Sequence, residues 1–185
     1  LNGVDANPNV IRVPQDYPLI QGAINAANPG DTVSVSSGTY HEHIVINKTL
    51  TLIGAGRSTT VIDANKTDTV VTIEANNVTL RGFAIQKGLG EGIIISGFNQ
   101  STISDNTIIL NGYDGIYIEN STGNTIKNNL ISNNAVNTEL AGIDLYSADG
   151  NTVSNNTITL QEKGVSAESS NNNTICENTI LENTV

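Results

Sequence analysis

The chain has 185 residues, with 18 acidic and 8 basic side chains, so its formal net charge is −10 at pH 7. Nucleic acid is excluded as a partner, because binding to phosphates needs clustered Lys or Arg, and the basic residues here are scattered from Arg12 to Lys163. Asn, Thr, Ile and Gly dominate and no apolar run is long enough for a transmembrane segment, which favours a folded β-rich domain over a helical, disordered or membrane-spanning chain.

The first 30 residues are predicted to hold an N-terminal strand and a capping helix. Asp16 is a candidate N-cap for a helix over 17–27, and Asn28-Pro29-Gly30 would end it. The apolar residues of this helix fall on one stripe: Leu19, Ile20, Ala23, Ile24 and Ala27. Such an amphipathic helix suits a lid over the end of a repetitive core.

From Asp31 onward the chain alternates apolar and polar residues in short runs, which is typical of β-strands. Clear runs lie at 31–35, 44–46, 50–53 and 70–73. Further along, two markers recur in one register. An inner Asn occurs at 106, 129, 156 and 178, in steps of 23, 27 and 22 residues, and the Gly of a Gly-Ile-x-Ile motif occurs at 92, 115, 142 and 164, in the same steps.

Short strands at a fixed period of about 22 residues predict a parallel β-helix, in which each strand pairs with its equivalent one coil away. The 155 residues from Asp31 to Val185 at about 23 per coil give about seven coils. Inward positions are predicted to stack in the columns Ile93/Ile116/Ile143/Val165 and Ile103/Ile126/Val153/Ile175. The inner Asn column is predicted to be structural: Asn tolerates the left-handed conformation at a tight turn, and its amides can bond one another in a ladder.

The opening of the chain resembles right-handed parallel β-helix proteins of the pectin-lyase-like superfamily. The segments that carry this resemblance are Ile20-Gln21-Gly22-Ala23-Ile24, Gly30-Asp31-Thr32-Val33, Gly38-Thr39-Tyr40-His41-Glu42 and Leu50-Thr51-Leu52-Ile53-Gly54. The repeats Asn124-Thr125-Ile126 and Asn173-Thr174-Ile175 look like NosD-type β-helix repeats, which are abundant in archaeal surface proteins. The resemblance implies an all-β, right-handed solenoid, while the function of this scaffold varies widely.

We therefore expect one domain over 1–185, with the strand and helix in 1–30 and the coils in 31–185. No second lid follows Thr179-Ile180-Leu181, so the C-terminal coil is expected to be uncapped. An open coil edge is a template for pairing, which makes end-to-end self-association a candidate interaction. Because the chain starts at Leu1 and holds no Met, we expect a processed chain or a piece of a longer protein.

The outward positions of the Gly-Ile-x-Ile strands gather candidate functional side chains. Two rows result, Ile94/Tyr117/Asp144/Ser166 and Ser96/Glu119/Tyr146/Glu168, with Tyr113 and Asp114 in the connection before one of these strands and a longer loop, 133–141, beside them. Tyrosines offer a flat surface for sugars and carboxylates accept hydroxyl hydrogen bonds. The candidate ligand-binding residues are Tyr113, Asp114, Tyr117 and Tyr146. A solvated face explains the same residues without a ligand.

Catalysis is a weaker hypothesis. Paired carboxylates on neighbouring coils can fall within glycosidase separations, which makes Asp144, Glu119 and Glu168 the weak catalytic candidates. The catalytic motifs of pectin methylesterases, polygalacturonases and pectate lyases are not found in the sequence.

His41 and His43 share one face of a strand and could form half of a copper or zinc site, but a defined site needs three or four ligands. We expect no cofactor. The single Cys176 can form no intramolecular disulfide and is predicted to lie on the surface, in a column with Arg81, Ser104, Lys127 and Ser154.

Seven N-x-(S/T) sequons suit an exported protein, although a chain rich in Asn and Thr also makes this tripeptide through its repeat. They begin at Asn47, Asn65, Asn77, Asn99, Asn120, Asn155 and Asn172. The leading hypothesis is a non-enzymatic extracellular or cell-surface module with a structural, envelope or adhesion role, and glycan binding is an additional candidate role. The alternatives are a carbohydrate-active hydrolase or lyase and a NosD-like periplasmic protein associated with a metal.

Overall fold

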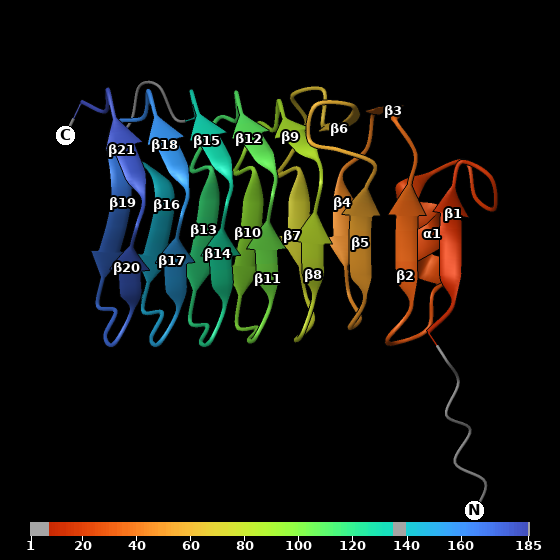
Figure 1. The fold of residues 1–185 in the computed structure, drawn as a ribbon, viewed down its shortest axis with the longest axis horizontal. Helices are drawn as coiled ribbons and strands as arrows, with labels where there is room; N and C mark the ends of the chain where they lie inside the picture. The colour runs from red at the N-terminus through yellow and green to blue at the C-terminus, as the bar shows by residue number, and fades with distance from the viewer. Residues whose placement is uncertain (1–7, 135–139, 185) are drawn as a thin grey trace, which may run out of the picture.

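A computed structural model describes residues 8–134 and 140–184, and it is a parallel β-solenoid. Figure 1 shows the strands stacked along the long axis, from α1 and β1 at one end to β19, β20 and β21 at the other. Three parallel sheets run along the solenoid, as the repeat predicted. No helix in the described residues is long and apolar enough to cross a membrane.

From β2 onward, successive strands belong in turn to sheet A, sheet B and sheet C, while α1 stands between the sheet A strands β1 and β2. Sheet A consists of β1 (Val10–Val13), β2 (Thr32–Val35), β5 (Thr51–Gly54), β8 (Thr79–Arg81), β11 (Thr102–Ser104), β14 (Thr125–Lys127), β17 (Thr152–Ser154) and β20 (Thr174–Cys176). Sheet B consists of β3 (Gly38–Tyr40), β6 (Thr60–Asp63), β9 (Ala84–Gln86), β12 (Thr107–Ile109), β15 (Leu130–Ser132), β18 (Thr157–Thr159) and β21 (Thr179–Leu181). Sheet C consists of β4 (Ile44–Ile46), β7 (Val71–Ile73), β10 (Ile93–Ser96), β13 (Ile116–Glu119), β16 (Ala141–Tyr146) and β19 (Lys163–Glu168).

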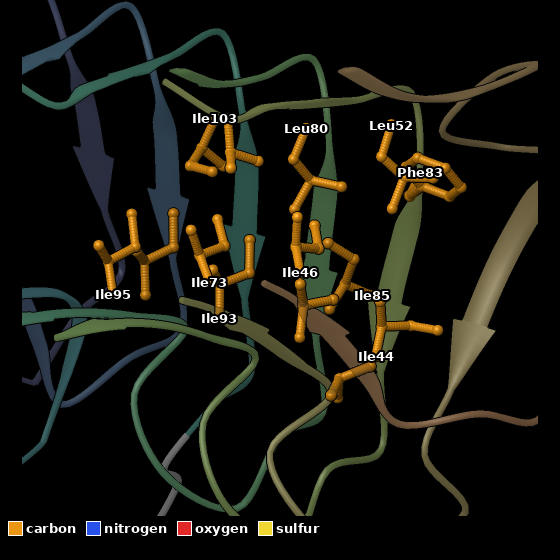
Figure 2. Close-up of a cluster of buried hydrophobic side chains, with 14 of the residues drawn as sticks. Ile44, Ile46, Leu52, Ile73, Leu80, Phe83, Ile85, Ile93, Ile95 and Ile103 are labelled. Atoms are coloured by element: carbon orange, nitrogen blue, oxygen red, sulfur yellow. The ribbon is translucent and has the colours of Figure 1, made fainter. Parts of the chain in front are cut away.

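The predicted inward columns are confirmed by the strand registers. Ile93 pairs with Ile116, which pairs with Ile143, and the sheet A column follows the same pattern through Ile103 and Ile126. All five side chains are 0% exposed. Figure 2 shows how branched aliphatic side chains from all three sheets meet in this core, together with Phe83 from the turn between β8 and β9. The aliphatic residues labelled are Ile44, Ile46, Leu52, Ile73, Leu80, Ile85, Ile93, Ile95 and Ile103. Because every coil adds the same apolar layer, the core is continuous along the axis.

The N-terminal lid is present but shorter than predicted. The helix α1 (Ile20–Ala26) packs on β1, β2 and β4 and buries Ile20, Ala23 and Ile24. The predicted range of 17–27 and the Asp16 cap are wrong, because the Asp16 carboxylate accepts a hydrogen bond from the backbone N–H of Arg12 instead, at 2.7 Å.

The first helical N–H groups are satisfied by Glu42, which comes from the segment between β3 and β4. Its two carboxylate oxygens accept hydrogen bonds from the N–H groups of Ile20 and Gln21, at 2.8 and 2.9 Å. A cap contributed from 22 residues further along the chain leaves no signature in the local sequence.

The inner Asn column forms the predicted amide ladder. The Asn129 Nδ2 group donates to the Asn156 Oδ1 atom at 3.0 Å and to the Ile103 carbonyl at 3.0 Å, while the Asn129 Oδ1 atom accepts from the Asn106 N–H at 3.0 Å. The left-handed residue, however, is the one that precedes each ladder position, such as Asn128 with φ 57°. The prediction that the ladder Asn itself takes this conformation is therefore wrong.

Two further ladders, which the repeat analysis missed, run along the other two corners of the coil. One connects Asn124, Asn151 and Asn173, and the other connects Asn111, Asn134, Gln161 and Asn183. Buried amides thus satisfy backbone groups at all three corners, where the chain leaves one sheet and enters the next.

The glycine of the Gly-Ile-x-Ile motif is required by close packing between coils. A Cβ atom added to Gly115 would lie 2.6 Å from the Gly142 carbonyl oxygen and 2.6 Å from the Ile131 Cγ2 atom. Both distances are too short for any side chain. The glycine of this motif therefore recurs because neighbouring coils approach closely where the chain enters sheet C.

Candidate functional site

The outer face of sheet C carries both predicted rows of side chains. Tyr117 pairs with Ile94 on one side and with Asp144 on the other, and Asp144 pairs with Ser166. The second row, Ser96, Glu119, Tyr146 and Glu168, is likewise in register. Because side chains alternate across a strand, both rows point away from the core. Residues 135–139 of the longer loop lie outside the described residues.

The tyrosines of this face differ in how far their side chains are buried. Tyr113 is 52% and Tyr146 is 39% exposed, whereas Tyr117 is half-buried. Burial, together with the nearby charges of Glu119 and Asp144, raises the pKa of Tyr117 to about 12. Its phenol is therefore neutral at physiological pH and can both donate and accept a hydrogen bond. The neighbouring Glu119 carboxylate accepts a hydrogen bond from the Ser96 hydroxyl at 2.8 Å.

Asp114 is the most perturbed carboxyl group of the site. It lies directly before Gly115 at the entrance to β13, is only 4% exposed, and accepts a 2.6 Å hydrogen bond from the Ala141 N–H. Burial raises its pKa to about 7; the bond from Ala141 opposes this shift, and the charges of Asp144 and Glu91 add to it. At neutral pH the group therefore exists in both protonation states.

Two further carboxylates lie near Asp114. The Asp144 Oδ1 atom is buried and has no hydrogen-bond partner in the part of the chain that the structure describes. Glu91 accepts a 2.6 Å hydrogen bond from the Thr69 hydroxyl. Glu91 was missed from the sequence, although it lies 23 residues before Asp114, which is the coil spacing that placed the other residues.

The remaining catalytic candidates are more dispersed. Glu168 is exposed and occupies the last coil, where it pairs with Tyr146. Glu119 lies in the same row as Glu168 but two coils away. The structure thus brings Asp144 toward Asp114, and it leaves Glu168 apart from them.

A shallow hollow of about 290 Å³ continues this face toward the N-terminal coils. It is lined mainly by outward residues of β7 and β10 and the turns after them: Thr72, Ile73, Glu74, Ile94, Ser96 and Phe98. The hollow joins the tyrosine rows through Ser96, whose hydroxyl bonds to Glu119. A chain-like ligand that crosses several coils would therefore find a continuous polar and aromatic strip.

The two histidines lie between β3 and β4, and both are exposed. The Nδ1 atom of His43 is 2.8 Å from the Thr69 carbonyl oxygen, so this nitrogen already has a partner. In residues 8–134 and 140–184 no three His, Cys, Asp or Glu side chains are placed to hold a metal ion. Cys176 is exposed in the last strand of sheet A, far along the chain from both histidines. The described residues therefore do not fit a copper or zinc centre.

The C-terminal coil presents an apolar end face. Ile175 and Ile180, whose columns are fully buried in earlier coils, are each 44% exposed here, and the outward Leu181 is 57% exposed. The uncapped C-terminal coil and end-to-end association through it both stay predictions.

Comparison with known proteins adds the family and several relatives. A family model described as "Periplasmic copper-binding protein (NosD)" matches residues 24–185. A cell surface glycoprotein of Methanothermus fervidus is 35% identical over 120 residues, which are 63% of this chain and 16% of that protein. The chain thus matches about a sixth of the length of this relative.

Solved structures with the same architecture include several enzymes. An alginate lyase from a Paenibacillus species superposes with a TM-score of 0.68 at 19% identity, covering 92% of this chain and 75% of the lyase. ORF18 of Geobacillus virus E2 superposes with a TM-score of 0.68 at 18% identity, covering 91% of this chain and 40% of the viral protein. Pectin methylesterase PemA of Erwinia chrysanthemi superposes with a TM-score of 0.60 at 15% identity, covering 83% of this chain and 55% of the esterase.

At these identities the structural likeness shows the pectin-lyase-like parallel β-helix fold alone. The family assignment comes from the sequence match, which covers the strands from β2 to β21 and the last three residues of the capping helix. Since that match spans far more than half of the chain, the protein belongs to the NosD family of β-helix proteins.

Proposed function

We propose that the protein is an exported, cell-surface β-helix module with a structural or adhesive role. The observation that carries this proposal is the 35% identity to a cell surface glycoprotein over 120 residues. The family description, which names periplasmic proteins, also supports export. Three amide ladders connect the later coils, from Asn106 onward, and a continuous core runs through the solenoid, so the solenoid is suited to act as a stiff rod that keeps its shape outside the cell.

Surface location is tested by antibody labelling of intact cells of the source organism. We expect labelling before permeabilisation, at the level of an established surface protein. Labelling that appears only after the cells are permeabilised would contradict the proposal, because it would place the protein inside the envelope.

We further propose that the outer face of sheet C binds polysaccharide. Tyr146 offers an exposed ring, the neutral phenol of Tyr117 can bond sugar hydroxyls, and the carboxylates of Glu119 and Asp144 can accept further bonds from them. A neutral glycan fits this face better than a polyuronate, since the chain carries a net charge of −10.

A glycan array probed with the purified protein tests this surface. Tyr146→Ala is expected to weaken binding about tenfold, because the stacking surface is lost. Tyr17→Ala is the matched control, because Tyr17 is 38% exposed, close to the 39% of Tyr146, but lies beside the capping helix. Equal losses in the two variants, or no binding to any glycan, would overturn the assignment of this face.

Glycoside hydrolysis is the second candidate function, and one observation favours it. Asp114, with its pKa raised to about 7, lies near the Asp144 carboxylate, and an acid beside a carboxylate is the pairing that glycosidases use. Release of reducing ends from the same glycans, abolished in Asp144→Asn, would support this function. Binding without release across the array would leave the surface module as the function.

A further inference from the structure

The asparagines of the chain fall into two groups that differ in burial. Seven are buried: Asn106, Asn111, Asn124, Asn129, Asn134, Asn151 and Asn156. None of these seven begins a sequon. Of the seven asparagines that do begin a sequon, six are exposed and Asn99 is half-buried.

The strand pattern explains this separation. Several ladder asparagines lie two residues before an inward apolar residue, as Asn129 does before Ile131, so a hydroxyl residue cannot stand at the second position. A sequon asparagine such as Asn155 instead precedes the ladder position and lies two residues before the outward Thr157. The alternation that buries the ladder thus places the sequons on the surface.

Backbone conformation also presents the sequon asparagines to solvent. Five of the seven have positive φ, at the turns between strands: Asn65 (51°), Asn77 (56°), Asn120 (48°), Asn155 (56°) and Asn172 (55°). Asparagine tolerates this left-handed conformation better than most residues. At these corners the chain turns around the solenoid, so a large group attached there projects away from the sheets.

Five sequons lie along a single edge of the solenoid, where sheet C gives way to sheet A. The asparagines are Asn47, Asn77, Asn99, Asn120 and Asn172, in the turns after β4, β7, β10, β13 and β19. Neighbouring coils are about 4.8 Å apart, so these asparagines follow one another along this edge. They take different positions in the turn: Asn47 and Asn120 directly follow their strands, whereas the other three stand three or four residues after theirs. Asn99 is the middle one of three in successive coils, and its Oδ1 atom accepts a 2.7 Å hydrogen bond from the Thr122 N–H.

We propose that the exposed sequon asparagines are N-glycosylation sites and that the edge between sheets C and A carries a row of oligosaccharides. The donor is a lipid-linked oligosaccharide. The Asn Nδ2 atom loses one proton to a base of the transferase and forms a bond to the anomeric carbon, while the bond from that carbon to the lipid phosphate oxygen breaks and the phosphate leaves with the electron pair. Asn99 stays unmodified, because it is half-buried and lies between two occupied neighbours.

This inference requires the export that the proposed function contains, but it does not depend on glycan binding by sheet C. The modified edge adjoins one end of the binding face, since Asn120 directly follows Glu119, whereas Asp114 lies before the beginnings of the sheet C strands. A glycan row on this edge would leave the opposite corner of the coil free for a partner.

The test is glycopeptide mass spectrometry on the full chain secreted from a host that modifies its own surface proteins at sequons. The chain carries a flexible tag with one added sequon, and only molecules whose tag is modified are analysed, so transfer and export are established for each of them. Glycans are expected on the six exposed sequon asparagines: Asn47, Asn65, Asn77, Asn120, Asn155 and Asn172. Asn120→Gln is expected to remove one glycan mass.

Leu130→Thr is the matched variant that adds a glycosylation site. It creates a sequon at Asn128, which is exposed and has φ 57°, and Thr is the residue at the paired positions Thr107 and Thr157. One additional glycan mass is expected at Asn128. Molecules with a modified tag but with unmodified Asn47, Asn77, Asn120 and Asn172 would overturn the proposal, and so would modification that ignores exposure and reaches Asn99 as fully as its neighbours.

Discussion

Replacing Asn129 with alanine is expected to lower the free energy of unfolding by about 3–5 kcal/mol. The Asn129 side chain is 1% exposed and takes part in four hydrogen bonds, with the Ile103 carbonyl, the Asn156 side chain, and the backbone and side-chain amides of Asn106. Alanine removes all four bonds. The Asn106 N–H and the Ile103 carbonyl lose these buried partners, whereas the Asn156 Oδ1 atom keeps the bond from the Asn129 N–H and the Asn106 Nδ2 group keeps the Leu80 carbonyl. Each unsatisfied buried group costs about 1–3 kcal/mol, and water reaching the gap would offset part of the sum.

Denaturant unfolding followed by circular dichroism measures this loss. Asn128→Gly is the matched control, because Asn128 is the neighbouring residue, is exposed and has φ 57°, a conformation that glycine adopts without strain. It should change stability by less than about 1 kcal/mol. Similar losses in both variants would mean that the turn, and not the amide ladder, carries the stabilisation.

The register of the solenoid could be predicted because two kinds of residue recur with the same spacing in the clear repeats. The ladder Asn satisfies backbone groups at a corner, and the glycine of the Gly-Ile-x-Ile motif allows close approach of the next coil. Their common steps of 23, 27 and 22 residues are also the offsets of the paired strands, as in Tyr117 with Asp144. The fold and both outward rows follow from that agreement.

Features that depend on contacts between distant residues could not be predicted in this way. The cap of α1 is Glu42, which lies beyond two strands, so the local pattern pointed to Asp16 instead. The ladder at the corner after sheet B was also missed, because one of its positions is Gln161 and so breaks the Asn pattern.

The candidate site was predicted as a set of residues but not as an electrostatic environment. Coil spacing placed Tyr117 and Asp144 side by side, as the structure confirms. It gave no information on depth: Asp114 was predicted as a surface ligand, yet it is 4% exposed and bonded to Ala141. Burial of this kind depends on how the connection from sheet B to sheet C folds, which periodicity does not describe.

The burial of Asp114 leads to the second prediction with a large expected effect on stability. Asp114→Asn is expected to make the protein more stable at pH 8, and to remove a pH dependence between about pH 4 and pH 7. The folded pKa of Asp114 is about 7, above its ordinary value of 3.8, so the native state holds the proton more tightly than the unfolded chain does. The stabilisation is fully present below pH 3.8 and is lost as the pH rises through 7, up to about 4 kcal/mol in total.

Other shifted carboxyl groups act in a different pH range. Hydrogen bonds from the N–H groups of Asn28 and Asn9 lower the pKa of Asp31, and in Asp63 burial is outweighed by hydrogen bonds from Lys87 and Gln86, so that its pKa is also lowered. The stability that these two groups contribute is present above the ordinary pKa of 3.8 and is lost below it. A loss of stability between pH 4 and pH 7 on raising the pH is therefore assigned to Asp114.

Asparagine suits the test because its Oδ1 atom can still accept the hydrogen bond from the Ala141 N–H, while no charge can form. Urea unfolding at pH 4, 5.5, 7 and 8 measures the effect in both proteins. Asp144→Asn serves as a second variant: it removes a charge that raises the pKa of Asp114, so the midpoint of the pH dependence should move to lower pH. Parallel pH curves for the native chain and Asp114→Asn would show that Asp114 is ionised without cost in the folded protein, and would also remove the pKa argument for an acid at this site.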